Sequence, residues 1–305
     1  MGKLSVFRRG LIVAAWATTT LTVNAQQKDE FQLTLDSINA YTIHYVDESV
    51  DKMWKDISTS NKEASQGISK KKGKYAVYKA LLQILDKKDI DLLTKDSGIN
   101  QEQARNILKY RKLEQPMTSK EFSSLLSLIS LSSMMTMLSG EEENTDNNEQ
   151  TVKDKEFKNL AQKAIAACKF KEQITSAVNG IIENMPNMNG ISAADKEKTK
   201  IVLNLMTKAM EEKMPYVMQM FYTKDQLKQL IYYSNLDEVK AFRDNFTQQW
   251  IRTYAKKTKD LINLTQKPSA IFQQATNYTD AEIEEFDKMT HAIKLPEIKT
   301  IEPQE

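Results

Sequence analysis

The chain has few of the residues that build disulfides, metal centres and covalent active sites. Its 305 residues include one cysteine, Cys168, and two histidines, His44 and His291. A single cysteine excludes an intrachain disulfide. There is no His-Glu-x-x-His motif and no paired cysteine for zinc, and only two histidines are available for a Ser-His-Asp triad. We therefore predict a buried, inert thiol at Cys168 and neither a cofactor nor a metal site.

Glycine and proline are also scarce, with 8 and 6 copies. Runs that alternate apolar and polar residues between turn signals, which are typical of strands, are nearly absent. Lysine, glutamine, leucine, methionine and alanine are plentiful, and they favour helices. The sequence predicts an all-α protein of antiparallel helices in two packed halves, with little or no sheet.

The chain lacks an excess of basic charge. It has 43 basic and 41 acidic residues, and three of the basic residues but none of the acidic ones lie in residues 1–25, so the remainder has a net charge of −1. The only compact basic run, at residues 70–74, is expected to be a solvated loop between helices. A nucleic-acid-binding protein needs a clustered basic footprint, so we expect no nucleic-acid partner.

Residues 1–25 have the pattern of a secretory signal peptide. A positive end, an apolar stretch and a small-residue cleavage site follow one another: Lys3, Arg8 and Arg9, then residues 11–17, then Val23, Asn24 and Ala25. We expect cleavage near Ala25 and a mature chain that is periplasmic or secreted.

The strongest local helix signals lie in residues 215–246. Thr223 can cap a helix through its hydroxyl group, and Gln226 can reach back to the backbone N–H of Thr223. Asn235 and Glu238 have the same spacing and are expected to start the next helix.

These capping positions belong to a longer pattern of aromatic and apolar residues. The pattern consists of Pro215, Tyr216, Phe221, Tyr222, Thr223, Gln226, Leu227, Leu230, Ile231 and Tyr233. Over roughly residues 205–250 the chain resembles an uncharacterised family of secreted bacterial helical proteins, domain of unknown function 2059. It departs from the family pattern at residues 236–239, where the family has Ser-Pro-x-Gly, and at Gln226, where Glu is usual. The resemblance implies an all-α exported protein and no particular activity.

The domain organisation is predicted from one polar run. Residues 141–150 contain no aliphatic or aromatic side chain, so they cannot bury enough surface to offset the entropy of ordering. We therefore expect an N-terminal helical domain at 26–140, an acidic and polar linker at 141–154, a C-terminal helical domain at 155–295 and a loose tail at 296–305. A long loop inside one helical domain would have the same sequence pattern.

Helical periodicity and capping residues place the individual helices. We expect Pro215 to bend or end the helix that precedes it. The expected helices are 31–58, 75–85, 100–113, 152–185, 192–214, 224–234, 235–264 and 279–293.

Residues 122–140 contain no charged side chain. A membrane span needs about 20 predominantly apolar residues, but this stretch has seven serines and no long aliphatic block. Small residues at helical spacing can also bring membrane helices together. We expect a central helix buried on most sides, and no transmembrane span in the mature chain.

Two groups of residues could bind a ligand or act in catalysis instead of only packing or facing solvent. Methionines at residues 206, 210, 214 and 218 follow one helix edge and could bind Cu(I), or they could fill the core. Acidic clusters at 211–212, 237–238 and 282–285 could serve a glycosidase, which needs two carboxylates across a cleft, or they could be solvated helix faces.

The sequence favours an exported binding or scaffold protein of the bacterial cell envelope that acts on an unidentified protein or envelope component. The alternatives are an envelope glycan hydrolase with paired carboxylates and a methionine-based Cu(I) binder. Aromatic and arginine side chains are enriched in binding hot spots. The interaction surface is therefore predicted at Tyr232, Tyr233, Arg243 and Trp250.

Overall fold

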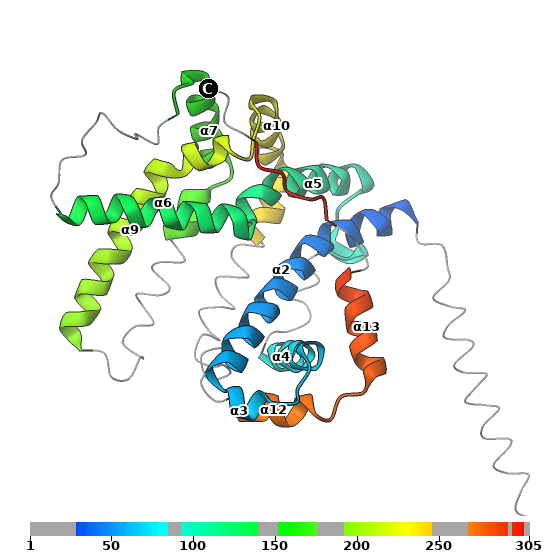
Figure 1. The fold of residues 1–305 in the computed structure, drawn as a ribbon. Helices are drawn as coiled ribbons and strands as arrows, with labels where there is room; N and C mark the ends of the chain where they lie inside the picture. Colours follow the sequence, from blue (N-terminus) through cyan, green and yellow to red (C-terminus); the bar gives the residue numbers. More distant parts are fainter. Residues whose placement is uncertain are drawn as a thin grey trace, which may run out of the picture.

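The computed structural model of the chain describes residues 29–84, 93–139, 152–175, 192–245, 268–291 and 295–301. The expected signal peptide and residues 141–150 lie outside this part. All regular elements of the described residues are helices, which confirms the all-α prediction (Figure 1). The helices are α2 (Glu30–Ser60), α3 (Lys62–Ser65), α4 (Lys70–Ile84), α5 (Gln101–Glu114), α6 (Lys120–Ser139), α7 (Lys155–Ala167), α9 (Ala193–Gln219), α10 (Lys224–Ser234), α12 (Ser269–Ala275) and α13 (Asp280–His291), with further helical residues at 170–175 and 237–245.

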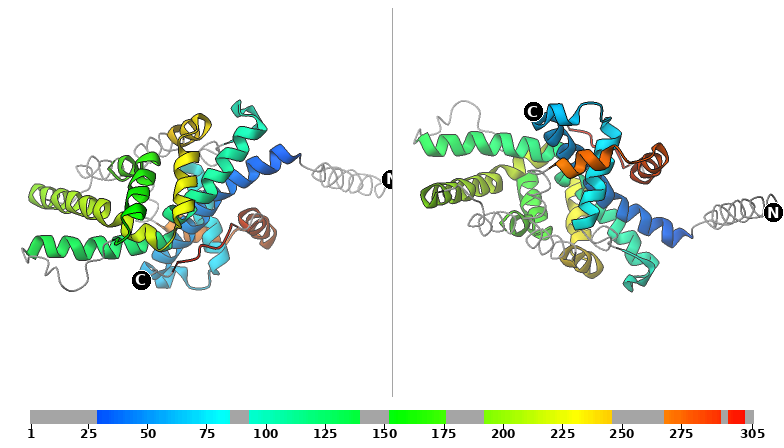
Figure 2. Two further views of the ribbon diagram at one scale, coloured as in Figure 1. Left: turned by 90° about the horizontal axis from the view of Figure 1, so that it is seen from above. Right: turned by 90° about the horizontal axis from the view of Figure 1, so that it is seen from below.

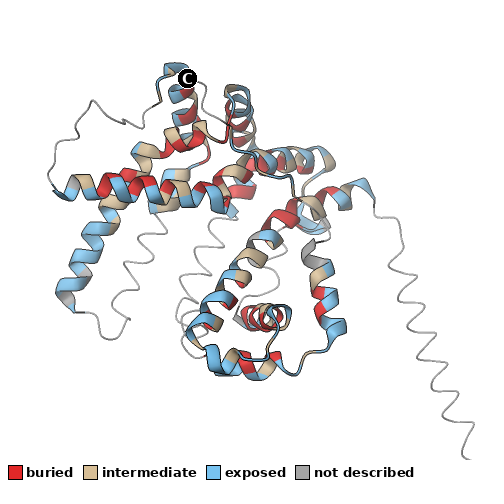
Figure 3. Cartoon of the chain, in the orientation of Figure 1, coloured by how far each residue is buried: buried red, intermediate tan, exposed pale blue. Residues whose placement is uncertain are grey.

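The helices form two packed groups that share α2 (Figures 1 and 3). The larger group contains α5, α6, α7, α9, α10, residues 237–245 and the first part of α2, where Leu35 and Ile38 are buried. The smaller group contains α4, α12, α13 and the second part of α2, where Val50 and Trp54 are buried. Because α2 has 31 residues, it is about 46 Å long, enough to serve both groups.

The packing therefore divides the chain differently from the two sequential domains expected. The last helices, α12 and α13, pack against α4 and α2 from the beginning of the chain. The larger core draws residues from both sides of the polar run at 141–150. Hydrophobic periodicity identifies the apolar face of each helix but not which distant helix covers it.

Of the two predicted helix caps, the one at Thr223 is confirmed. Thr223 and Gln226 form a reciprocal capping box at the start of α10, and Asn100 with Gln103 does the same for α5. The expected cap at Asn235 is wrong, because Asn235 ends α10 with a helical backbone (φ −92°, ψ −6°), and its side-chain amide donates to the Ile231 carbonyl (2.9 Å).

The basic run at residues 70–74 is not a loop, contrary to the sequence prediction. It forms the first turns of α4, and its lysines join α4 to α2 and α13 through ion pairs. The N–O distances are 2.7 Å for Lys70–Asp51, 2.9 Å for Lys74–Asp47 and 2.6 Å for Lys71–Asp287. Acidic residues on neighbouring helices thus offset repulsion between the lysines.

Two helix boundaries also differ from expectation. The helix expected over 152–185 breaks after α7 at Cys168 and Lys169, and Lys169 has a left-handed backbone with φ of 52°. Its ammonium group bonds to the Asp244 carboxylate at 3.0 and 3.1 Å. Pro215 does not end its helix, since α9 continues to Gln219.

The uncharged helix α6 is buried on one face only, not on most sides as predicted. Phe122 and Leu126 lie in the larger core, whereas Leu128 and Leu131 are exposed. Of the helices in the described ranges, none combines the length and the apolar character that crossing a membrane requires. Figures 1 and 2 show α6 and α9 extending together, away from the smaller group.

The segment 295–301 runs along the larger core, although a loose tail was expected from residue 296. Gln115 donates its side-chain amide to the Pro296 carbonyl (3.0 Å), and the Ile301 amide donates to the Met220 carbonyl (2.6 Å). Ile298 packs against the larger core between these bonds. The end of the described chain is thus tied to the larger group.

Gly73 allows α4 to approach α2 closely. A Cβ atom added at Gly73 would lie 2.1 Å from the Trp54 ring. The backbone of α4 therefore packs directly on the indole ring, which is buried in the smaller core.

We expect Gly73→Ala to destabilise the protein by about 2 kcal/mol, because overpacking outweighs the helix propensity that alanine adds. Urea unfolding followed by circular dichroism measures the change. The matched control is Gln83→Ala, at an exposed position of the same helix. Unchanged stability of Gly73→Ala would contradict the close contact with Trp54.

Candidate functional site

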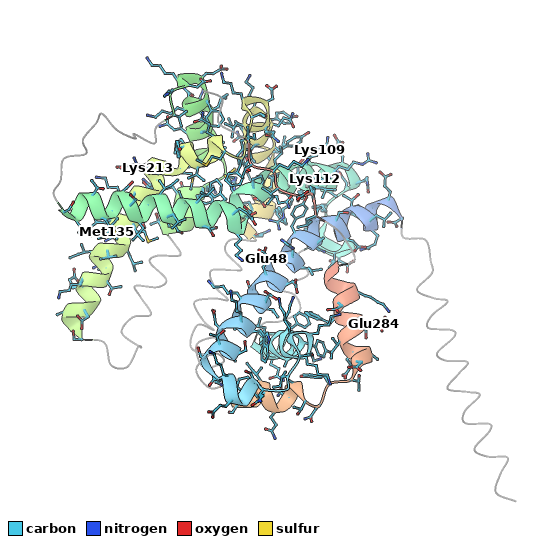
Figure 4. The ribbon with its side chains drawn as sticks, viewed as in Figure 1. Glu48, Lys109, Lys112, Met135, Lys213 and Glu284 are labelled. Atoms are coloured by element: carbon cyan, nitrogen blue, oxygen red, sulfur yellow. The ribbon has the colours of Figure 1, made fainter. Side chains whose placement is uncertain are left out.

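Two of the four predicted surface residues lie side by side on α10. Tyr232 is 63% exposed, and Tyr233 is half-buried. Their ring centroids are 5.1 Å apart in an edge-on arrangement. The Lys109 ammonium group, from α5, lies 5.5 Å from the Tyr233 ring centroid (Figure 4). Trp250 lies outside the described residues.

Arg243, the third described member of that predicted surface, is only 4% exposed. Its guanidinium group donates a hydrogen bond to the Ala167 carbonyl at the end of α7. The last carbonyls of a helix lack partners within the helix, so this bond caps α7. Arg243 therefore acts in the interior rather than on a surface with Tyr232. The sequence prediction placed Arg243 on the surface because arginine is enriched in binding hot spots.

A second buried arginine, which the sequence did not single out, lies nearby on α5. Arg111 is 2% exposed, and its guanidinium carbon lies 5.3 Å from the Tyr41 ring centroid and 5.8 Å from that of Phe242. It forms an ion pair with Glu114 one turn later. A buried charge needs such a partner because desolvation is costly. In the sequence, Arg111 resembles any basic residue in the last turn of a helix.

Cys168 and Tyr110 complete this buried polar cluster. The Cys168 sulfur lies 3.3 Å from the Ser234 hydroxyl, which also donates to the Leu230 carbonyl (2.6 Å). Burial raises the pKa of Cys168 to about 11, and burial together with the nearby Glu114 charge raises the pKa of Tyr110 well above its usual value. Both groups are neutral near pH 7. A thiol in this state is a poor nucleophile, so the prediction of a buried, inert Cys168 is supported.

A cleft of about 660 Å³ lies between α7, residues 170–175 and α9. Binding sites for small molecules commonly have volumes of about 300 to 1,000 Å³. The turn at Cys168 and Lys169 separates α7 from residues 170–175, and both line the cleft. Its apolar lining consists of Val152, Ile165, Ala166, Phe170, Ile174, Met214, Pro215 and Tyr216.

Pro215 removes one backbone hydrogen bond from the helix beside the cleft. Proline has no backbone N–H, so the Glu211 carbonyl lacks its usual partner four residues later. Both Glu211 and Pro215 line the cleft. This stretch of α9 thus lacks one helical hydrogen bond where it borders the cleft.

The charged side chains around the cleft balance one another. Three lysines and three glutamates line it, and the pair Lys171–Glu211 joins residues 170–175 to α9 with an N–O distance of 2.9 Å. Glu212 lies 4.0 Å from Lys208 (Figure 4 labels the neighbouring Lys213). A glycosidase would need two free carboxylates facing each other, so these paired acids do not favour that reaction.

The methionine edge of α9 belongs mainly to the core. Met214 and Met218 are buried in the larger core, and Met210 packs against it. This placement supports the core-packing interpretation over Cu(I) binding. Among the described residues, no three His, Cys, Asp or Glu side chains are grouped to hold a metal ion.

We expect Glu114→Gln to destabilise the protein by about 3 kcal/mol, because it leaves the Arg111 charge buried without its carboxylate. Denaturant unfolding measures the loss. The control, Glu102→Gln, removes an exposed carboxylate from the same helix and should cost less than about 1 kcal/mol. Equal effects of the two substitutions would contradict the role assigned to the pair.

We expect the Cys168 thiol to react slowly with a disulfide reagent at pH 8 in the folded protein and rapidly after unfolding. The folded state holds the thiol proton more tightly, so its contribution to stability is complete below about pH 9 and is lost as pH rises through about 11. Absorbance of the released thiolate follows the reaction. Rapid stoichiometric labelling of the folded chain would contradict the burial.

No protein-family model, curated protein or solved structure significantly matches the chain. The arguments for its function therefore come from its own sequence, fold and cleft.

Proposed function

We propose that the protein is an exported binding or scaffold protein of the bacterial cell envelope, and that the cleft between α7 and α9 is its ligand site. The observation that carries the binding role is the apolar cleft of about 660 Å³. The signal-peptide pattern of residues 1–25 supports export.

The lining of the cleft indicates the class of ligand. Phe170, Ile174 and Tyr216 provide an apolar surface, which favours a ligand with an apolar body because burial removes that body from water. The balanced lysines and glutamates give no preference for a strongly charged molecule.

The position of the cleft supports binding rather than catalysis. Its walls are fixed by neighbouring packed elements: Arg243 caps the end of α7, and Lys169 pairs with Asp244 just beyond it. A site held by rigid elements loses little entropy when a ligand binds. The titratable groups of the nearby buried cluster are neutral or paired, which does not suit them to proton or acyl transfer.

A neutral apolar fluorophore, N-phenyl-1-naphthylamine, tests the cleft in the mature chain, residues 26–305. We expect its fluorescence to increase on binding, and Ala166→Trp to weaken binding about tenfold because the indole fills the cleft. The control, Ala281→Trp, adds the same side chain at an exposed position on α13 and should bind like the wild type.

Equal binding by both tryptophan variants would contradict the cleft as the site. Export is tested separately by fractionating bacteria that produce the full chain and sequencing the N-terminus of the product. The proposal expects an envelope or secreted product that begins near Gln26. An uncleaved product in the cytoplasm would contradict export while leaving the fluorophore result unaffected.

A further inference from the structure

The segment 295–301, here called the strap, lies on the larger group of helices, although the helix before it, α13, packs in the smaller group (Figure 1, dark red). Its apolar residues Leu295, Ile298 and Ile301 are half-buried, and the four residues between them are exposed. Burial at every third position is typical of an extended chain with three residues per turn. The strap thus turns one side toward the protein, where Ile298 packs against the larger core.

Hydrogen bonds hold both ends of the strap. The Gln115 side chain donates to the Pro296 carbonyl (3.0 Å), and the Ile301 amide donates to the Met220 carbonyl (2.6 Å). Gln115 begins the short helix η3 (Gln115–Thr118) that follows α5, and Met220 lies at the end of α9. The strap therefore bridges two elements of the larger group.

Tyr222 fixes these two elements to each other beneath the strap. Its hydroxyl group donates to the Leu113 carbonyl (2.8 Å) and accepts a hydrogen bond from the Met117 amide (3.3 Å). Both Tyr222 and Met117 are buried in the larger core. The surface on which the strap lies is thus held in place by contacts that do not involve the strap.

The two groups of helices pack together mainly through α2. Within the described ranges, none of α5, α6, α7, α9 and α10 packs extensively against α4, α12 or α13, whereas α5, α4 and α13 all pack against α2. Thr42 and Val50 on α2 are buried, and the described residues between them are half-buried or exposed. Figure 4 labels Glu48 in this stretch. The strap is thus a second connection between groups that share one long helix.

We propose that the strap is a reversible clamp that sets the position of the smaller group relative to the larger one, with the middle of α2 as the hinge. While the strap is docked, the chain beyond α13 is fastened to the larger core, so the groups are joined at two places. When the strap detaches, α2 carries the packing between these helices alone. Hinge motion occurs where few contacts resist it.

The strap is built for reversible docking. It is not helical, and Pro296, Glu297, Lys299 and Thr300 are exposed. Segments with few buried apolar contacts and exposed backbone hydrogen bonds open at a low cost in free energy. The strap therefore detaches while both groups of helices stay folded.

Hydrogen exchange of the mature chain tests the docking of the strap, with Ile298→Asp as the variant. An aspartate is costly to bury against an apolar core, so the amides of residues 297–301 should exchange at least about tenfold faster than in the wild type. Thr300→Asp is the matched control, because it adds the same charge at an exposed position of the strap and should exchange like the wild type. Circular dichroism verifies that both variants are folded.

Spin labels measure movement between the groups in the same variants. Cysteines replace two exposed residues, Lys112 on α5 and Gln273 on α12, and the native Cys168 is buried. Pulsed electron paramagnetic resonance gives the distribution of distances between the two labels. We expect this distribution to be at least about 1.5-fold broader in Ile298→Asp than in the wild type or Thr300→Asp, because the groups pivot about α2.

A second pair of labels, at Lys112 and Gln229, is the control for movement inside the larger group. Gln229 is exposed on α10, which packs against α5. The distance distribution of this pair should be the same in all three chains. Equal broadening of both label pairs would indicate general loosening of the larger group and would overturn the clamp.

Three other results would also overturn the proposal. Faster exchange of the strap with an unchanged distance between the groups would show that the strap does not hold them. Unchanged exchange in Ile298→Asp would show that Ile298 does not anchor the strap, and equal effects of the two aspartates would show that its burial is irrelevant. The test is independent of the ligand site, because the strap does not line the cleft.

Discussion

The buried charge of Arg111 is the constraint on which the larger group of helices depends. A guanidinium group that is 2% exposed must keep its carboxylate and its aromatic neighbours, because water cannot replace them. Glu114 provides the carboxylate from α5, Tyr41 provides one ring from α2, and Phe242 provides the other from the helical residues 237–245. Three elements that are distant in sequence are thus fixed around one side chain.

The same region shapes the candidate cleft. Arg243 follows Phe242 and caps α7, and Asp244 pairs with Lys169 at the turn where the chain leaves α7. That turn separates α7 from residues 170–175, and the cleft lies between these elements and α9. The buried cluster therefore positions the walls of the cleft. This arrangement is consistent with the proposed binding role, in which a ligand lies against the apolar lining.

Local features of the structure could be predicted from the sequence, and long-range ones could not. The cap at Thr223 and the helix around residues 31–58 follow from backbone chemistry and periodicity within a few turns. The burial of Arg243, the one-sided burial of α6 and the packing of α12 on α4 depend on partners distant in sequence. The cleft also escaped prediction, because it depends on the left-handed backbone at Lys169, a non-glycine residue that gives no sequence signal.

Hydrogen exchange of the mature chain, followed by mass spectrometry, tests the organising role of Arg111 most directly. The amides of α5, residues 237–245 and the first part of α2 should exchange slowly together in the wild type. Replacement of Arg111 by methionine, which removes the charge and keeps an apolar side chain, should raise exchange in residues 237–245 and at the end of α7 more than in α12 and α13. Unchanged exchange in residues 237–245 would contradict the account.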